Sequence, residues 1–470
     1  MNNTRRNFLK LSGALGAGLA SGGFSGVLGA EQAIDTFYAE EGQPAVFNMC
    51  GFAAPKLDTV RIGFIGTGNR GKAAVRRMSF IEGVEVKGIC DLRPEKAQGA
   101  AKDMRPGHQP TFYTDQEDAW KKMCDRNDID LIYIATPWAL HTPMAVYAMQ
   151  HGKHVCVEVP AAKTIEECWQ LVNTSEKTKK HCIILENCCY DFFEMLTLNM
   201  ARQGFFGDIV HCEGAYIHDL AAGNFSKDKY YKLWRLEENS KRNGNLYPTH
   251  GLGPVSQIMN LNRGDKMDYL VSLQSNDFMM GAMEKELLEK DKATYAPYAN
   301  RHFRGNMNTS VVKTAKGRSI MIQHDVTTPR PYSRLHLVSG TKAMAQKYPL
   351  PERIAVGDDW MKEAELDELK KKFQPAITNL MGDIARKFGG HGGMDFLMDW
   401  RTIDCLRNGL PVDMDVYDAA AWSCIGPLSE WSVAHRSNSI DVPDFTRGAW
   451  KTNNPVDILL TQAGSTKVIV

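Results

Sequence analysis

The chain has 470 residues, of which 43% are hydrophobic, and its formal net charge at pH 7 is +1. A chain of this length and apolar content can bury a large core and is expected to form two domains. Its 56 basic residues are balanced by 55 acidic ones, so the composition excludes a strongly basic surface for nucleic acid.

The first 30 residues have the pattern of an export signal. Thr4-Arg5-Arg6-Asn7-Phe8-Leu9-Lys10 resembles the twin-arginine signal, and a glycine- and alanine-rich apolar run from Leu11 to Ala30 follows it. Because glycines interrupt this run, we interpret it as part of a signal peptide and expect no transmembrane anchor in the mature chain. The expected partner is the twin-arginine export machinery, and the expected location is the periplasm.

Residues 31–58 predict an extended arm, and the stretch from Val60 to Gly71 then predicts a buried strand, a glycine turn and a helix. Gly66, Gly68 and Gly71 form the pattern G-x-G-x-x-G. The first two glycines let the chain turn and bring backbone N–H groups against a pyrophosphate, and the third lets the helix pack closely on the strand. The helix N-terminus adds partial positive charge, so this turn predicts a dinucleotide site.

A second strand, residues 84–90, ends at Asp91, twenty residues after Gly71. A carboxylate at this place suits a ribose 2′-hydroxyl and repels a 2′-phosphate, which favours NAD over NADP. The alternative is an ordinary βαβ unit without a ligand. The order of strand, turn, helix, strand and acid favours the cofactor site.

Residues 59–186 alternate strands and helices as in a doubly wound parallel sheet of the α/β class. Further strands are expected at 129–136, 154–158 and 182–185, with helices at 141–151 and 164–179. Ligands of such sheets bind at the carboxyl ends of the strands. The candidates at those ends are Asn69, Arg70, Asp91, Trp138, Ala139, Leu140, His141, Glu158, Val159 and Asn187.

Residues 187–470 have the pattern of an α+β substrate domain with a mostly antiparallel open sheet. A helix from Met394 to Asn408 is expected to return and pack between the domains. Strands are expected at 210–217, 267–275, 310–314, 319–324 and 334–339, and helices near 191–203, 253–261, 361–372, 392–408 and 415–436.

The cysteines and histidines do not have the spacing of a metal site. The 11 cysteines form no Cys-x-x-Cys pairs at zinc spacing, and several lie in apolar runs, so buried thiols are expected. Cys188 and Cys189 are adjacent, but a disulfide between neighbours is rare. There is also no His-Glu-x-x-His motif, and we expect no metal.

Three motifs resemble the Gfo/Idh/MocA superfamily of sugar-type oxidoreductases. They are the glycine turn, Ala135-Thr136-Pro137 with His141, and the strand end Glu158-Val159-Pro160. In most of those enzymes the last motif is Glu-Lys-Pro, and its lysine helps to carry the alcohol proton during hydride transfer. Val159 replaces that lysine here, which argues against a simple dehydrogenase.

Four longer stretches are similar to glycoside hydrolase family 109, the NAD-dependent α-N-acetylgalactosaminidases. They are Glu158–Ala162, Glu186–Tyr190, Trp234-Arg235 and, above all, the run Asn245–Pro254. The resemblance implies that NAD is held by the strand-end residues named above. It implies that the sugar is bound by Tyr216, Arg235, Tyr247, Pro248, Thr249, His250 and Tyr332.

An ordinary glycosidase uses two carboxylates, and no convincing pair stands out in this sequence. A bound NAD⁺ offers another route, in which hydride leaves C3 of the sugar and the C1 substituent is eliminated as a base removes the C2 proton. Water then adds, and the hydride returns to C3. Hydrolysis of terminal α-linked N-acetylgalactosamine is therefore expected to leave the cofactor unchanged.

This chemistry needs bases at two positions. His250 is the candidate for the C3 hydroxyl and for a donor to the enolate oxygen, because an unperturbed histidine titrates near pH 6.5 and suits both roles near neutral pH. A turn of the form Tyr-Pro-Thr-His-Gly is also expected to position its side chain, while the glycines that follow let the substrate approach. For the C2 proton we expect Tyr190 first and Tyr247 second, with the phenol pKa lowered by Lys163 or Arg235. The roles of Glu186, Asp219 and Lys163 stay open.

Two other functions remain consistent with the sequence. One is an exported sugar oxidoreductase that couples two substrates on a trapped nicotinamide cofactor, and the other is a catalytically silent sugar-binding protein. The open sheet of superfamily relatives often pairs between subunits, so the resemblance implies a homo-oligomer.

Overall fold

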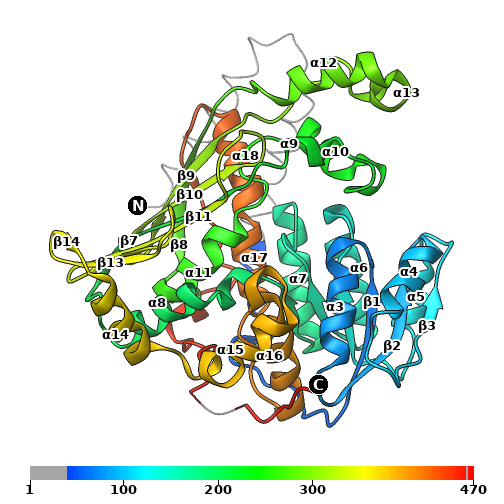
Figure 1. Cartoon of the computed structure of the whole chain (residues 1–470), viewed down its shortest axis with the longest axis horizontal. Helices are drawn as coiled ribbons and strands as arrows, with labels where there is room; N and C mark the ends of the chain where they lie inside the picture. Colours follow the sequence, from blue (N-terminus) through cyan, green and yellow to red (C-terminus); the bar gives the residue numbers. More distant parts are fainter. Residues whose placement is uncertain (1–39, 462–463, 470) are drawn as a thin grey trace.

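A computed structural model of the chain describes residues 40–461 and 464–469 (Figure 1). The expected export signal and the first part of the expected arm lie outside these residues. The described part of the arm packs on the folded body, where the Met49 amide donates to the Tyr417 hydroxyl at 3.1 Å. Within the described residues, no helix is both long enough and apolar enough to cross a membrane.

The first domain contains the expected parallel sheet, with strand order β3-β2-β1-β4-β5-β6. The strand order reverses between β1 and β4, which places a ligand crevice at their carboxyl ends. The strands are nearly continuous buried runs, as a sheet covered on both faces requires. They are β1 (Val60–Ile65), β2 (Val84–Cys90), β3 (Thr111–Tyr113), β4 (Leu131–Ile134), β5 (His154–Val157) and β6 (Cys182–Ile184).

Helices cover both faces of this sheet (Figure 1). The helix after the glycine turn, α3, also packs against α16 (Met394–Asn408) of the second domain, so the helix expected to return between the domains does so. The helical segments of the first domain are α3 (Asn69–Ser79), α4 (Pro94–Ala101), α5 (Ala119–Cys124), η1 (Trp138–Leu140), α6 (His141–Gln150) and α7 (Ile165–Thr178).

The second domain is built on a nine-stranded sheet of order β14-β13-β12-β11-β7-β10-β9-β8-β15, in which only the β7–β10 pair is parallel. The five strands expected from the sequence are confirmed as β7 to β11. Four short strands, β12 to β15, were not predicted. The bounds are β7 (Ile209–Ile217), β8 (Met267–Gln274), β9 (Asn308–Thr314), β10 (Ser319–Asp325), β11 (Ser333–Gly340), β12 (Met344–Gln346), β13 (Arg353–Val356), β14 (Asp359–Trp360) and β15 (Ile440–Asp441).

Helix α11 crosses this sheet at very short range because two glycines face each other. A Cβ atom on Gly251 of α11 would lie 2.2 Å from the Ala215 backbone nitrogen, and one on Gly214 of β7 would lie 2.3 Å from the Gly251 carbonyl oxygen. Helix α11 begins at Thr249, four residues before the helix expected at 253. The run around His250 is therefore the first turn of a tightly seated helix and not the turn that we expected.

The remaining helices differ from expectation in two places. The helix expected at 415–436 is two helices that meet at Cys424, and helix α15 was not predicted. The bounds are η2 (Asn187–Tyr190), α8 (Phe192–Arg202), α11 (Thr249–Met259), α14 (Glu363–Phe373), α15 (Ala376–Phe388), η5 (His391–Gly393), α17 (Val416–Ser423), α18 (Ile425–Ala434) and η6 (Ala449–Lys451).

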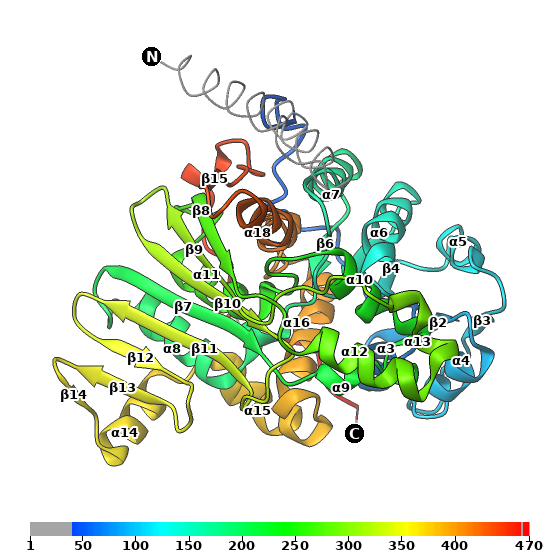
Figure 2. The same ribbon diagram turned by 90° about the horizontal axis from the view of Figure 1, so that it is seen from above.

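Two helical insertions form a separate small layer that we call the cap, residues 221–241 and 280–303. Figures 1 and 2 together place its helices α12 and α13 above the α3 and α4 end of the first domain. The sequence analysis did not predict these helices. They are α9 (Ala221–Asn224), η3 (Tyr231–Leu233), α10 (Trp234–Lys241), α12 (Met280–Lys290), α13 (Lys292–Tyr295) and η4 (Ala296–Tyr298).

The eleven cysteines are free thiols in the structure, and all except Cys50 are buried. The expectation of buried thiols is confirmed. The adjacent Cys188 and Cys189 are among them, so no disulfide joins these two residues.

Candidate active site

The glycine turn has the geometry of a dinucleotide cradle. Gly66 has φ +84°, and a Cβ atom on Gly71 would lie 1.8 Å from the Gly66 carbonyl oxygen, so both positions require glycine. Gly68 is different, because a Cβ atom added there would face open space, with an Arg93 nitrogen 4.0 Å away as its nearest neighbour. No side chain caps α3, so its first N–H groups face this open space, where a pyrophosphate fits.

Asp91 closes the cradle at the end of β2. Its Oδ2 accepts the Thr67 amide at 2.9 Å, and its Oδ1 accepts the Arg93 amide at 3.0 Å and the Arg93 Nε at 3.3 Å. The carboxylate is buried and held in one orientation by these bonds. Its position beside the turn is the one that a ribose-binding acid occupies in this fold.

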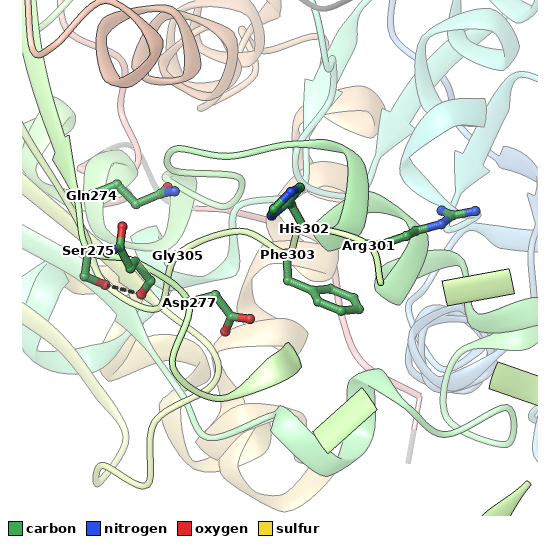
Figure 3. A pocket seen from close by; sticks show the side chains of 8 residues that line it. Gln274, Ser275, Asp277, Arg301, His302, Phe303 and Gly305 are labelled. Carbon is green, nitrogen blue, oxygen red and sulfur yellow. Dashed lines mark hydrogen bonds between the residues drawn. The ribbon is translucent and has the colours of Figure 1, made fainter. Parts of the chain in front are cut away.

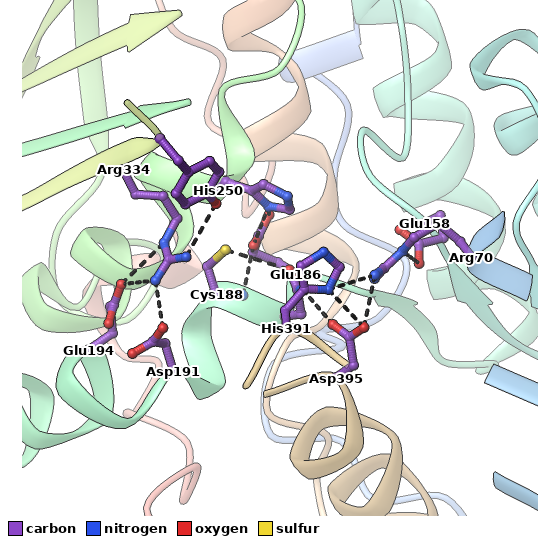
Figure 4. Close-up of polar contacts among 12 residues, drawn as sticks. Arg70, Glu158, Glu186, Cys188, Asp191, Glu194, His250, Arg334, His391 and Asp395 are labelled. Atoms are coloured by element: carbon purple, nitrogen blue, oxygen red, sulfur yellow. Dashed lines mark hydrogen bonds and ion pairs between the residues drawn. The ribbon is translucent and has the colours of Figure 1, made fainter. Parts of the chain in front are cut away.

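Arg70 joins the two domains behind the cradle (Figure 4). Its Nε donates to Glu158 Oε1 at 2.9 Å, and its Nη1 donates to Asp395 Oδ2, also at 2.9 Å. Asp395 comes from α16 and also accepts Asn187 Nδ2 at 2.5 Å and pairs with His391 Nδ1 at 3.0 Å. Burial opposes ionisation of Asp395, but the charge of Arg70, the hydrogen bond with His391 and the charge of Arg77 outweigh it and hold the pKa of its carboxyl well below the ordinary value.

The loop after β4 has two exposed and two buried members. Ala139 and Leu140 are exposed, while Trp138 and His141 are buried. The His141 nitrogens lie 2.7 Å from the Pro160 carbonyl and 2.8 Å from the Thr136 carbonyl, and burial lowers the pKa of this ring. His141 therefore ties the loop to the segment after Val159, and its expected contact with NAD stays a prediction.

A histidine–carboxylate pair lies beside this network (Figure 4). His250 Nδ1 lies 2.7 Å from Oε1 and 2.9 Å from Oε2 of Glu186, which is fully buried at the end of β6. Burial raises the pKa of Glu186, but the neighbouring histidine and the amide of Cys188 outweigh it, so the net pKa is lowered. Because Glu186 holds Nδ1, the other nitrogen, Nε2, is left to face a ligand.

Arg235 lies among three aromatic rings on the sugar side. Its guanidinium carbon is 5.1 Å from the Trp138 ring centre, 5.3 Å from that of Tyr230 and 5.2 Å from that of Tyr247. Its Nη1 donates to the Tyr230 hydroxyl, whereas Nε and Nη2 are buried without a hydrogen-bond partner among the described residues. Buried donors of this kind are costly unless a ligand satisfies them, so Arg235 marks a binding site for an oxygen-rich group.

Tyrosine and histidine rings connect Arg235 to the Glu186–His250 pair. The Tyr247 ring centre lies 4.8 Å from that of Tyr216 and 4.9 Å from that of His250. Tyr216 donates to or accepts from His218 Nδ1 at 3.0 Å, and the Tyr332 ring lies 5.0 Å from the His218 ring. The structure thus brings together the expected sugar-binding residues Tyr216, Arg235, Tyr247, His250 and Tyr332, and Pro248 and Thr249 are buried at the start of α11.

Tyr190 is not part of this group, which corrects our first choice for the C2 base. Its hydroxyl donates to Asp413 Oδ2 at 2.9 Å, and Arg401 Nε binds the same oxygen at 2.9 Å. Burial and then Asp413 raise the pKa of Tyr190 well above its ordinary value. The hydroxyl points into the packing between α16 and the segment after it and away from the crevice.

The expected lowering of a tyrosine pKa is also not found. Burial raises the pKa of Tyr247 well above its ordinary value, and the nearby Arg235 only partly offsets this. Burial likewise raises the pKa of Tyr216 to about 12. Lys163 is not available to Tyr247 or to Tyr216, because its Nζ pairs with Glu238 at 2.6 Å.

Glu186, Cys188 and His250 have ligand atoms within 4.8 Å of one another, a spacing that a metal ion could use. His250 already pairs with Glu186, and burial raises the pKa of the Cys188 thiol well above its ordinary value. In the structure the three side chains form a histidine–carboxylate pair with a neighbouring thiol.

A polar cavity of about 350 Å³ opens elsewhere, beside the cap (Figure 3). None of the residues expected to bind NAD or sugar lines it. Its walls are Gln274, Ser275, Asn276, Asp277, Arg301, His302, Phe303 and Gly305.

Three groups of the site were missed in the sequence analysis: the role of Glu186 as partner of His250, the neighbour His218, and Asp395 with His391. One signal for the last pair was available. Residues 389–393 read Gly-Gly-His-Gly-Gly, and all five have positive φ, between +48° and +112°. A histidine inside such a glycine run indicates a constrained loop, which brings His391 against Asp395.

The fold and the cradle define a nicotinamide-dependent protein of the Gfo/Idh/MocA type. Residues 60–185 match the family model described as oxidoreductase family, NAD-binding Rossmann fold. A solved scyllo-inositol dehydrogenase from Lactobacillus casei, with bound NAD(H) and scyllo-inositol, has a TM-score of 0.56 over 82% of this chain and 99% of its own, at 15% identity. At that identity the likeness shows the shared fold.

The second domain identifies the family more narrowly. Residues 190–452 match the model of the glycosyl hydrolase 109 C-terminal domain. A protein of Bacteroides fragilis named alpha-N-acetylgalactosaminidase is 51% identical over 417 residues, 87% of this chain and 97% of its own. A glycosyl hydrolase family 109 protein of Shewanella pealeana is 46% identical over 472 residues, 98% of this chain and all of its own. The chain belongs to glycosyl hydrolase family 109 and is a glycosidase that acts on glycans.

Proposed function

We propose that this glycosidase releases terminal α-linked N-acetylgalactosamine, with NAD as its retained cofactor, by a redox-neutral route. The observation that carries the proposal is the Glu186–His250 pair beside the unpaired donors of Arg235, at the mouth of the dinucleotide cradle. The name of the Bacteroides fragilis relative supports the choice of sugar.

The carboxylates of this crevice are not arranged as in a two-carboxylate glycosidase. Glu158 is bonded to Arg70, Asp395 to Arg70 and Asn187, and Glu186 to His250. The two acids of ordinary glycosidases need one carboxyl free to protonate the leaving oxygen and another free to attack or to activate water. The bonded acids therefore favour a route in which they orient other groups.

When bound, NAD supplies the acceptor and later the donor of a hydride at C3 of the sugar. His250 Nε2 takes the proton of the C3 hydroxyl as the hydride leaves, and ionised Glu186 stabilises the imidazolium that results. The C3 ketone acidifies the C2 hydrogen, and a base takes that proton as the C1–O bond breaks and the leaving oxygen gains a proton from solvent. Water then adds at C1 and C2 regains a proton, and His250 returns its proton to the C3 oxygen as the hydride comes back to C3.

Tyr247 is the base that we propose for the C2 proton. Its ring centre lies 4.9 Å from that of His250 and 4.8 Å from that of Tyr216, beside the residues expected to bind the sugar. The Tyr190 hydroxyl is bonded instead to Asp413. Burial raises the pKa of both phenols, and each has a carboxylate that raises it further and an arginine that lowers it, so position and not charge favours Tyr247.

The test is release of nitrophenol from the nitrophenyl α-glycoside of N-acetylgalactosamine by purified protein, with no NAD added. We expect release, with the nicotinamide dinucleotide recovered from the denatured protein as NAD and not NADP. The matched β-glycoside is the control for anomeric specificity. Absence of release, together with reduction of the cofactor by free sugar, would support the oxidoreductase that the structural neighbours suggest.

We also propose that the chain is exported by the twin-arginine route to the periplasm, supported by Arg5-Arg6 in the N-terminal motif. Replacement of both arginines by lysine is expected to leave the protein in the cytoplasm in cell fractionation. Periplasmic recovery of that variant would contradict the proposal.

A further inference from the structure

The cap has a hydrophobic core of its own. Seven side chains form this cluster, which is separate from the core of the two domains, and they come from both insertions: Phe225, Leu233, Leu236, Met280, Tyr295, Tyr298 and Phe303. Because the two insertions share one buried cluster, residues 221–241 and 280–303 pack as a unit. The cap can therefore act on its surroundings as one rigid piece.

The first contact of the cap with the dinucleotide domain is made by Tyr231. The Arg93 guanidinium carbon lies 4.6 Å from the centre of the Tyr231 ring, within the range of a cation–π contact. Arg93 is also bonded to Asp91, the acid expected at the ribose. Tyr231 thus reaches the cradle at the end that binds the adenosine half of a dinucleotide.

The second contact lies at the glycine turn itself. Asn69 Nδ2, in the first turn of α3, donates to the Lys229 carbonyl oxygen at 3.4 Å. Lys229 is two residues before Tyr231, so one short segment of the cap touches both the pyrophosphate turn and Arg93, the residue bonded to the ribose acid. The segment spans the space between the ends of β1 and β2.

The backbone after Tyr231 is held in an unusual conformation. Lys232 and Leu233 both have φ +54°, in the left-handed region that side-chain-bearing residues rarely adopt. Such a conformation persists where packing imposes it, and Leu233 is buried in the cap cluster. The kink directs Tyr231 toward Arg93 and, on its other side, begins helix α10, which carries Arg235.

We propose that Tyr231 and the Lys229 backbone form a clasp that retains the dinucleotide, by closing over its adenosine half and the cradle. The inference rests on the proposed function in that NAD is the occupant. It goes further by assigning retention to the cap, which at the same time positions Arg235 for the sugar. An enzyme that returns its hydride to the same sugar needs the reduced cofactor to stay bound throughout each turnover.

The test measures release of NAD from the purified holoprotein after transfer into nucleotide-free buffer. For Tyr231→Ala we expect release about tenfold faster than for the wild type, because the ring contact that closes the clasp is lost. Tyr231→Phe keeps the ring and should release NAD at the wild-type rate. Tyr269→Ala on β8 is the matched control, since Tyr269 is 39% exposed and Tyr231 is 38% exposed.

Equal release rates for Tyr231→Ala and the wild type would overturn the clasp, and so would equal acceleration in Tyr231→Ala and Tyr269→Ala. Faster release from Tyr231→Phe would also overturn the role of the ring. Nitrophenol release by Tyr231→Ala should recover when excess NAD is added, because the variant retains the groups that act on the sugar. A wild-type protein that neither holds nor binds NAD would contradict the proposed function itself, which distinguishes that failure from failure of the clasp.

Discussion

The two sides of the crevice differ in how completely their polar groups are paired. On the cofactor side, Arg70 binds two carboxylates, and Asp395 binds Arg70, Asn187 and His391. On the sugar side, Arg235 has two buried nitrogens without a partner. Paired groups hold a geometry, whereas unpaired ones are available to bind and react, so the comparison separates the residues that build the site from those that act on the sugar.

The largest effect is expected for His250→Ala, which removes the base at the C3 hydroxyl. Turnover should fall by about 10³-fold or more, since general acid–base catalysis contributes up to about 10⁴-fold. NAD should stay bound, because His250 lies outside the cradle network. Steady-state nitrophenol release measures turnover, and the cofactor content of the same preparation measures how much NAD stays bound. His151→Ala on the surface of the first domain is the control. Unchanged turnover would remove His250 from the reaction.

The next effect separates the two candidate tyrosines. Tyr247→Phe should lower turnover by about 10²-fold or more, whereas Tyr190→Phe should change it by less than about twofold. The second variant loses the bond to Asp413 and should cost about 1 kcal/mol of unfolding free energy. Urea unfolding and nitrophenol release measure the two outcomes. The reverse ranking of the two activities would restore Tyr190 as the base.

Glu186→Gln tests the orientation of His250. The amide cannot stabilise an imidazolium as the carboxylate does, so we expect turnover to fall by about 10²-fold with the fold retained. The lowered pKa of Glu186 means that the native protein gains stability from the ionised Glu186 carboxylate above the ordinary pKa of about 4.5 and loses it as pH falls through the lower, folded-state value. Unfolding free energy against pH should therefore drop less steeply at the acid end in Glu186→Gln than in the wild type.

A smaller effect is expected for Arg235→Lys. Lysine keeps the charge but cannot present the guanidinium donors or lie flat against three rings, so KM should rise by about tenfold while kcat changes less. Initial rates over a range of nitrophenyl glycoside concentrations give both constants. A fall in kcat alone would place Arg235 in the transition state instead of in sugar binding.

The smallest effect on turnover is expected on the paired side. Asp395→Asn leaves Arg70 with Glu158, so turnover at saturating NAD should stay within about tenfold of the wild type, while unfolding free energy falls by about 2 kcal/mol. Urea unfolding and initial rates test this. If turnover fell as far as in His250→Ala, the distinction between the two sides of the crevice would fail.

Much of the first domain could be predicted because its strands are continuous apolar runs and its turn requires glycine at Gly66 and Gly71. Strands β12 to β14 have four residues or fewer, too few to show a period, and they were missed. Helix α15 was also missed, although its buried Ile377, Met381 and Ala385 recur every four residues and could have been found.

The sequence analysis predicted most of the site residues but few of the contacts between them. The run from Tyr247 to His250 could be recognised, but its partner Glu186 lies 64 residues away in the sequence, and Asp395 lies 325 residues from Arg70. No local sequence pattern indicates contacts between residues so far apart in the chain. Tyr190 was misassigned because its place after a strand end suggested the crevice, whereas the side chain turns toward Asp413.

The most direct test of the redox-neutral route is the isotope content of the released sugar. Hydrolysis of the nitrophenyl α-glycoside in deuterated water, without added NAD, should place deuterium at C2, because the account requires that the C2 proton be removed and replaced from solvent. Sugar released with protium fully retained at C2 would contradict the elimination route and would indicate direct displacement at C1.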